Sequence, residues 1–179
     1  MFFFILKLIS SFPSQRILDT GGNRSERKKW KITFQDTNCI LFFINLSSFS
    51  QKNLEDEITS KSDEEFNTYS DMINEEWVSK KPIFLIFNMS DLFKKQIQNG
   101  FDVKKFESNF FKDFDGKNNF DDILSFIKGK YLKIRSENVV TFITSGFDLE
   151  RNLILLNKML EKLNGREIES HYPYDPILE

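Results

Sequence analysis

The chain has 179 residues, with 25 Lys and Arg against 27 Asp and Glu and a net charge of −2, so it has the length of one ordinary domain and no chain-wide positive field to attract nucleic acid. Its single Cys excludes an intrachain disulfide and a zinc site built from cysteines, and is typical of a reducing compartment. Apolar residues make up 40% and charged residues 29%, the range of a globular domain rather than of a disordered chain.

The first elements predicted along the chain are strands. Phe2–Ile9 is an apolar run that carries Lys7 and lacks a small-residue cleavage site, so a buried strand is favoured over a signal peptide. A shorter strand is predicted over Gln15–Leu18 and a short helix over Glu26–Phe34. Cys39–Leu46 is a continuous apolar run of the kind that is buried on both faces of a parallel sheet.

The rest of the chain alternates helices and strands. Leu54–Lys80 is polar, with apolar residues at three- and four-residue spacing, which predicts a helix that Pro82 stops. The later elements follow in this order: buried strand Ile83–Asn88, helices Val103–Phe114 and Asp121–Lys130, buried strand Val139–Thr144, and amphipathic helix Leu149–Leu163. This order predicts an α/β three-layer domain with a mostly parallel sheet over residues 1–165, and residues 166–179 are expected to form a mobile C-terminal tail.

Three polar turns follow predicted strands: Asp19-Thr20-Gly21-Gly22-Asn23, Asn88-Met89-Ser90-Asp91, and Thr144-Ser145-Gly146. Because the carboxyl ends of parallel strands meet at one edge of a sheet, these turns are expected to converge there. An Asp at a strand end can hold Mg²⁺ through water, and a Gly pair lets backbone N–H groups approach a phosphate. An Asn and an Asp three residues apart could read a base. Each motif alone also fits a plain turn, with Asp91 as the N-cap of a following helix.

Longer stretches carry a resemblance to a known family. DTGGNRSERKKW followed by FQDTNCILFFINLSSFSQ resembles the switch II helix and next strand of heterotrimeric G-protein alpha subunits. IFLIFNMSDLFKKQI resembles the strand and guanine-reading N-K-x-D motif of that family, and VVTFITSGFDLERN resembles the segment with its T-C-A motif. The resemblance covers roughly residues 15–163. It implies a partial Ras-like fold of the P-loop NTPase type and a signalling switch that binds GTP or GDP with Mg²⁺.

Roles follow from this resemblance position by position. Asp19 would lie in the magnesium shell, and Asn23 stands where the family has the catalytic Gln. The implied nucleotide-binding set is Asp19, Thr20, Gly21, Gly22, Asn23, Asn88, Met89, Asp91, Thr144 and Gly146. The implied surface for a beta-gamma dimer or an effector is Arg24, Arg27, Lys28, Lys29 and Trp30, with Trp30 as its apolar anchor. Nucleic-acid binding by these basic residues is the less favoured interpretation.

The departures from the family pattern matter as much. Asn23 is one methylene shorter than Gln, which would misplace an attacking water and cost on the order of 10²-fold in rate. Met89 replaces the Lys of the guanine motif, and no G-x-x-x-x-G-K-[ST] occurs in the 179 residues. The family's first strand, P-loop, switch I and helical insertion have no counterpart here. That strand lies between those matching Gln15–Leu18 and Cys39–Leu46, so two unpaired strand edges are expected unless the gap closes. Met1–Ile9 is the candidate to be recruited into the gap, although its place in the order matches the family's second strand.

The expected function is therefore that of an alpha-subunit-like signal transducer whose GTP binding and hydrolysis are lost or severely impaired. Two alternatives remain open: a module that binds beta-gamma or an effector without nucleotide, and a fragment without function. No apolar stretch reaches the 18 or so residues of a membrane span. We expect a cytoplasmic chain that meets a membrane only through its partners.

Overall fold

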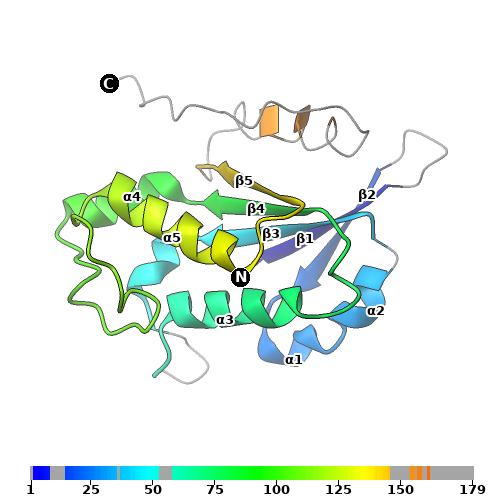
Figure 1. Ribbon diagram of the computed structural model, residues 1–179, viewed down its shortest axis with the longest axis horizontal. Coiled ribbons are helices and arrows are strands. Elements are labelled where there is room, and N and C mark those ends of the chain that lie inside the picture. The colour runs from blue at the N-terminus through cyan, green and yellow to red at the C-terminus, as the bar shows by residue number, and fades with distance from the viewer. Residues whose placement is uncertain are drawn as a thin grey trace. The chain divides into compact units, whose positions relative to one another are not determined.

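The computed structural model of the chain describes residues 2–8, 15–35, 37–52 and 58–145, together with Ile154, Leu155, Asn157, Lys158 and Glu161. The chain divides into two units, Met1–Phe147 and Asp148–Glu179. Every strand of the described residues belongs to the first unit (Figure 1). In the second unit the five described residues are helical and lie within the predicted helix Leu149–Leu163. The predicted domain boundary at residue 165 and the tail lie outside the described residues.

A five-stranded sheet forms the centre of the first unit, in the order β2-β1-β3-β4-β5. The strands are β1 (Phe2–Leu8), β2 (Gln15–Gly21), β3 (Cys39–Asn45), β4 (Ile83–Asn88) and β5 (Val139–Ile143). Strands β3, β4 and β5 pair in parallel, and β1 runs antiparallel to both β2 and β3. The α/β class with a parallel core of three strands, as in a partial Ras-like domain, is confirmed.

Strand β1 fills the place between β2 and β3. It pairs along its whole length with β2, from Phe2 opposite Gly21 to Leu8 opposite Gln15. On its other side Phe3–Leu6 pairs with Cys39–Phe42 of β3. The gap is therefore closed by the opening strand, the alternative to two unpaired edges at this place. Unpaired backbone groups between two strands are costly, and an apolar segment that supplies partners to both edges removes that cost.

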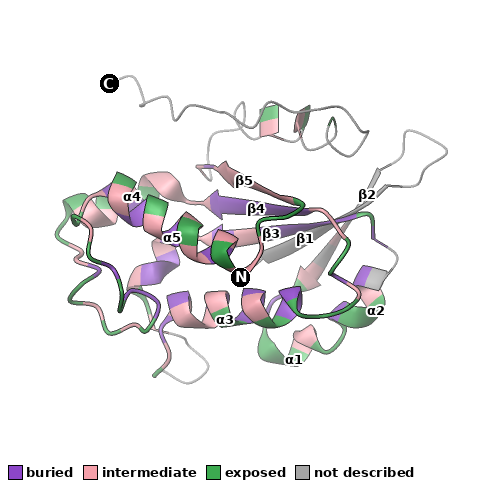
Figure 2. Cartoon of the chain, in the orientation of Figure 1, coloured by how far each residue is buried: buried purple, intermediate pink, exposed green. Residues whose placement is uncertain are grey.

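The helices pack on one face of the sheet. Alternate residues of β3 and β4 share one apolar cluster with buried side chains of four helices. These helices are α2 (Trp30–Gln35), α3 (Lys61–Ile73), α4 (Ser90–Gln98) and α5 (Phe120–Ile134). Figure 1 shows α3, α4 and α5 on one side of the sheet, and Figure 2 shows β4 buried along most of its length. The third layer depends on the helix predicted over 149–163, which lies in the other unit, so it stays a prediction.

Side-chain caps decide where two of the long helices begin. The Ser60 hydroxyl accepts a hydrogen bond from the Asp63 N–H at 3.0 Å, and the Asn119 side chain accepts one from the Asp122 N–H at 2.9 Å. Helix α3 is therefore shorter than the predicted Leu54–Lys80: it begins after Ser60 and ends at Ile73, and turns follow up to Pro82.

Two further helix predictions need correction. Glu26–Phe34 forms two short helices, α1 (Arg24–Arg27) and α2, rather than one. Val103–Phe114 is not helical and consists of turns and irregular chain. The Asp63 carboxylate accepts hydrogen bonds from the backbone N–H groups of Asn109 and Phe110 at 3.2 and 2.6 Å. This segment therefore satisfies its backbone through a side chain of α3 instead of through a helix of its own.

Candidate functional site

The polar turns at the strand ends share one edge of the sheet. Because β1 is antiparallel to both β2 and β3, β2 runs in the same direction as β3, β4 and β5, and their carboxyl ends face the same way. Three strand spacings of about 4.8 Å separate β2 from β4, so their ends lie roughly 14 Å apart. The predicted residues therefore form two groups, one after β2 and one after β4 and β5.

The group after β4 and β5 is tightly connected. The Thr144 hydroxyl donates a hydrogen bond to Asn88 Oδ1 at 2.9 Å, and the Thr144 N–H donates to the Phe87 carbonyl at 2.9 Å. The Ser90 N–H donates to the Thr144 carbonyl at 3.2 Å. Asn88 and Thr144 are thus held together where both strands end, and Gly146 lies outside the described residues.

Asp91 lies in the first turn of α4 and is not its N-cap, because the helix begins at Ser90 and Met89 holds the cap position. The interpretation of Asp91 as a plain N-cap is therefore wrong. Its Oδ1 atom is buried, and no hydrogen-bond partner for it is found in the described part of the chain. A buried acceptor without a donor costs free energy unless a ligand supplies one.

A residue that sequence reasoning did not select, Asn45, also lies at this edge. It ends β3 directly opposite Asn88 in β4. Its Oδ1 accepts hydrogen bonds from the Ser47 N–H at 3.1 Å and the Ser47 hydroxyl at 2.8 Å. The Gln96 side chain of α4 donates to the Ser47 carbonyl at 2.9 Å, which ties the turn after β3 to that helix. The available signal was that Asn45 ends an apolar strand as Asn88 does.

These residues fit one half of a guanine nucleotide. Guanine presents N–H groups beside a carbonyl oxygen, so its edge needs an acceptor and a donor side by side. The buried Asp91 Oδ1 would supply the acceptor, and the Asn88 amide at the end of β4 would supply a donor. The base half of the ligand therefore fits the residues present.

The turn after β2 is held in place by the segment that follows it. The Gly21 carbonyl accepts a hydrogen bond from Trp30 Nε1 at 3.0 Å, and the Gly22 carbonyl accepts one from Arg27 Nε at 3.1 Å. A Cβ atom on Gly21 would lie 2.8 Å from Cγ of Glu26, so an acidic side chain covers this turn. Thr20 Oγ1 is buried without a partner in the described residues. The side chain of Asp19 is not described, so the magnesium prediction stays a prediction.

Asn23 precedes α1 and is exposed. Its carbonyl accepts hydrogen bonds from the Glu26 and Arg27 N–H groups at 2.9 and 3.2 Å, while its side chain makes no capping bond. The amide of Asn23 is thus available at the surface. No observation here tests its role at the place of the catalytic Gln.

Glu64 of α3 holds the segment that resembles switch II. Its carboxylate accepts hydrogen bonds from Arg24 Nη2 at 2.8 Å and from Arg27 Nη2 at 2.6 Å. The Arg24 guanidinium, with that of Arg27, keeps the pKa of Glu64 below its usual value although burial opposes this. Sequence reasoning missed Glu64, because nothing in the sequence distinguishes it from its acidic neighbours.

Trp30 does not form an exposed anchor. Only 5% of its surface is exposed, and its ring stacks on Phe34 at a centroid distance of 5.7 Å. Little of its ring is exposed, and its role as a partner anchor stays a prediction. The exposed apolar residue of this face is Ile32, at 79%. A groove of about 330 Å³ lies between this segment and α3, lined by Lys28, Trp30, Thr68, Met72 and neighbouring residues.

Comparisons with known proteins identify the family of this chain. Residues 8–162 match the family model described as G-protein alpha subunit. The chain is 34% identical to a guanine nucleotide-binding protein subunit alpha of Candida albicans (strain WO-1) over 73% of this chain and 29% of that protein. It is 33% identical to the alpha-2 subunit of Caenorhabditis briggsae over 71% of this chain and 34% of that one. It is 36% identical to the alpha-8 subunit of Dictyostelium discoideum over 69% of this chain and 30% of that one.

The fold is that of an α/β domain whose sheet has a parallel core of three strands. The chain belongs to the G-protein alpha subunit family, whose model matches most of its length. It spans about a third of the length of the relatives that it matches. Within the described residues, no helix has the length and apolar character needed to cross a membrane. The same residues hold no group of three or more His, Cys, Asp or Glu side chains that could bind a metal ion.

Met89 offers a direct test of backbone strain at this edge. Its φ of 59° and ψ of 35° place it in the left-handed region, which costs a side chain about 1 kcal/mol relative to glycine. Met89→Gly is expected to raise the free energy of unfolding by about 0.5–1 kcal/mol in a urea titration. Ser90→Gly, at an ordinary helical position, is the control and is expected to lower it. If both variants are less stable than the wild type, the left-handed backbone at Met89 is not strained.

Proposed function

We propose that this chain is an alpha-subunit-like signal transducer. Its partner-binding face consists of α1, α2 and the neighbouring surface of α3. This face is held in place without a bound nucleotide. The observation that carries the proposal is Glu64, which pairs with Arg24 and Arg27 at 2.8 and 2.6 Å. Arg27 also binds the Gly22 carbonyl. These contacts all come from the chain itself, so no γ-phosphate is needed to order the segment.

The chemistry of this face suits a beta-gamma dimer or an effector. The Lys29 side chain is 71% exposed and pairs with Glu26 at 2.8 Å. Lys28 is exposed, and Ile32 is 79% exposed beside it. An exposed isoleucine in a segment that also carries exposed lysines is an arrangement that a partner with an apolar contact and an acidic rim can cover. Ile32 takes the anchoring role that the sequence assigned to Trp30.

Binding to a beta-gamma dimer tests the proposal. Purified dimer is immobilised and the 179-residue chain is titrated over it. The wild type is expected to bind in the micromolar range, and Ile32→Asp and Lys28→Glu are each expected to weaken binding about tenfold or more. Ile58→Asp is the matched control, because Ile58 is 80% exposed but belongs to another surface. Glu64→Gln is expected to weaken binding several-fold by loosening the segment.

Addition of a GTP analogue with Mg²⁺ is expected to change this affinity less than about twofold, because the face is already ordered. A strong nucleotide dependence would contradict the proposal. Equal binding of the wild type, Ile32→Asp and Lys28→Glu would show that another surface binds. No binding by a folded wild type would remove the partner-binding function and leave a fragment without function as the better account.

Nucleotide binding by the 179-residue polypeptide is expected to be weak. A P-loop would supply roughly five charge-assisted bonds to phosphate, worth about 1.5–3 kcal/mol each. Together these bonds are comparable with the roughly 12 kcal/mol of a nanomolar complex. Titration with a fluorescent GTP analogue and Mg²⁺ is expected to show no saturation below about 1 μM. Asn23→Gln is expected to produce no GTPase turnover, and turnover in that variant would reveal a phosphate site that the geometry does not suggest.

We place this function in the cytoplasm, with a membrane reached only through a partner. The relatives that the chain matches are named as guanine nucleotide-binding alpha subunits, which supports a role of the same kind here. The base half of the site, with Asn88 and Asp91, supports recognition of guanine in particular.

A further inference from the structure

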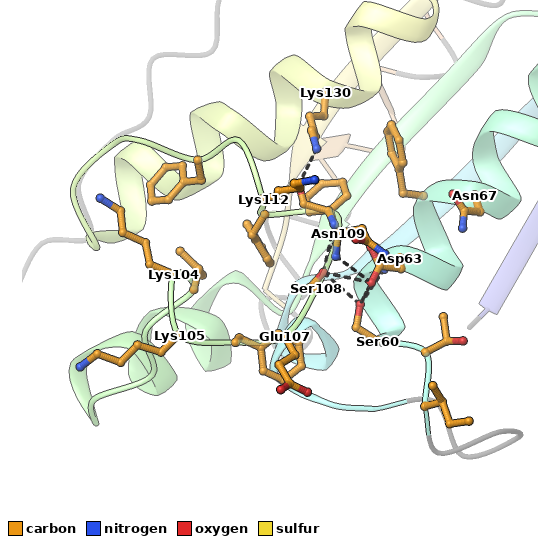
Figure 3. A pocket seen from close by; sticks show the side chains of 18 residues that line it. Ser60, Asp63, Asn67, Lys104, Lys105, Glu107, Ser108, Asn109, Lys112 and Lys130 are labelled. Carbon is orange, nitrogen blue, oxygen red and sulfur yellow. Dashed lines mark hydrogen bonds between the residues drawn. The ribbon is translucent and has the colours of Figure 1, made fainter.

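A second cavity of about 1000 Å³ is lined by the start of α3, the segment 103–112 and Lys130 of α5 (Figure 3). None of the residues assigned above to the nucleotide or to the partner face lines it. Its volume falls at the upper end of the range found for small-molecule sites.

The walls of this cavity are held from two sides. The Asp63 carboxylate accepts hydrogen bonds from the Phe110 and Asn109 N–H groups and from the Ser108 hydroxyl. From the other side the Lys130 ammonium donates to the Phe110 carbonyl. Figure 3 shows both sets of bonds meeting on the segment around Asn109. Because its wall is fixed by side chains of two helices, the cavity exists before any ligand arrives.

The lining combines aromatic rings with ammonium groups. The rings are Phe66, Phe106, Phe110, Phe111 and Phe114. The cations are Lys104, Lys105, Lys112 and Lys130, of which Lys104 and Lys105 extend away from the Asp63 cluster in Figure 3.

The acidic side chains of the lining do not balance these cations. The four lysines of the lining face two acids, Asp63 and Glu107. Glu107 is 91% exposed and lies 3.6 Å from the Lys52 ammonium. The charge left to face the cavity is therefore positive.

Lys130 is the cation best placed to meet a ligand. Its side chain is 22% exposed, and its ammonium lies 5.0, 5.2 and 5.9 Å from the ring centroids of Phe110, Phe126 and Phe66. Burial lowers its pKa, since the ammonium has lost water that Asp113, at 4.0 Å, and Asp63 replace only in part. An anion placed beside it would restore that lost stabilisation.

We propose that this cavity is a binding site for a small aromatic carboxylate. The flat ring of the ligand packs against the phenylalanine rings, where its apolar area is removed from water. Its carboxylate faces Lys130 and Lys112. The site is separate from the nucleotide edge and from the partner face, and it does not depend on the function proposed for either.

Isothermal titration of the 179-residue chain with 2-naphthoate, and with its neutral analogue 2-naphthamide, tests this proposal. The naphthoate is expected to bind at least about tenfold more tightly, because only it carries the charge that the lysines recognise. Lys130→Met and Lys112→Met keep most of the side-chain volume and remove the charge. Lys112→Met is expected to weaken naphthoate binding about fivefold or more while naphthamide binding stays within twofold. Lys130→Met also removes the bond to the Phe110 carbonyl, so it is expected to weaken both ligands and naphthoate about fivefold more than naphthamide.

Lys80→Met is the matched control, because Lys80 is exposed and does not line the cavity. It is expected to leave both affinities unchanged. Circular dichroism checks that each variant is folded, and the exposed Lys112 keeps the test decisive if Lys130→Met fails to fold. Equal affinity for the two ligands, an equal loss in Lys80→Met, or no heat from naphthoate up to about 1 mM would overturn the proposal.

Discussion

Replacing Phe110 with Ala is expected to lower the free energy of unfolding by about 3–5 kcal/mol, the usual cost of removing a large buried ring. Phe110 is 2% exposed. Its ring lies 5.0–5.4 Å, centroid to centroid, from the rings of Phe49, Phe66 and Phe111. It also contacts Tyr131 and Phe126 at 6.1 Å, so it joins α3, α5 and the turn after β3. No neighbouring ring can move into the space without losing its own contacts.

Urea unfolding followed by circular dichroism measures this loss. Ile32→Ala is the control, because Ile32 is 79% exposed and its truncation should change stability by less than about 0.5 kcal/mol. A loss of under about 1 kcal/mol in Phe110→Ala would mean that the segment 99–119 does not carry part of the core.

The second large effect concerns Glu65, whose carboxyl is inside the core. It is 5% exposed, and burial raises its pKa to about 8 from an ordinary value of 4.5. Its Oε2 atom and the hydroxyls of Tyr69 and Tyr131 are buried and have no hydrogen-bond partners in the described residues. Between pH 4.5 and 8 the unfolded chain has lost this proton and the folded chain keeps it. The contribution of Glu65 to stability is therefore full below about pH 4.5 and is lost as the pH rises towards 8.

Within that window Glu65 is expected to lower the free energy of unfolding by about 1.4 kcal/mol for each pH unit. Glu65→Gln removes this titration. The free energy of unfolding of the variant, relative to that of the wild type, is therefore expected to rise from pH 5 to pH 8 when both are unfolded with urea. Glu64→Gln is a control of opposite sign, because the pKa of Glu64 is lowered and its contribution is lost as the pH falls. If the free energy of unfolding changes with pH in the same way in Glu65→Gln and in the wild type, the carboxyl of Glu65 is not buried and protonated.

The acids of α3 show where prediction from sequence ends. Asp63, Glu64 and Glu65 are consecutive and chemically alike. Asp63 binds N–H groups of the segment 99–119, Glu64 binds two arginines of the switch II-like segment, and Glu65 is buried. Successive helical residues point about 100° apart, so each meets a different neighbour, and those neighbours are set by the tertiary fold.

Elements that depend on local pattern were predictable. The continuous apolar runs gave β3 and β4 within a residue of their observed ends, and the polar turns after β4 and β5 lie together as expected. The segment Val103–Phe114 was not predictable. Its backbone bonds go to Asp63, which lies about 45 residues earlier in the chain, and no local pattern records such a partner.

The direction of β1 has a practical consequence for any fusion to this chain. Phe2 lies opposite Gly21, the last residue of β2, so the amino end of β1 opens onto the edge that carries Asn45, Asn88 and Thr144. A purification tag attached ahead of β1 would emerge at this edge, between the turns that follow β2 and β3. The resemblance to alpha subunits implies that the family's first strand belongs between β2 and β3, where β1 lies in this structure. Such a strand and β1 would compete for one set of backbone partners, and only one of them could be in the sheet at a time.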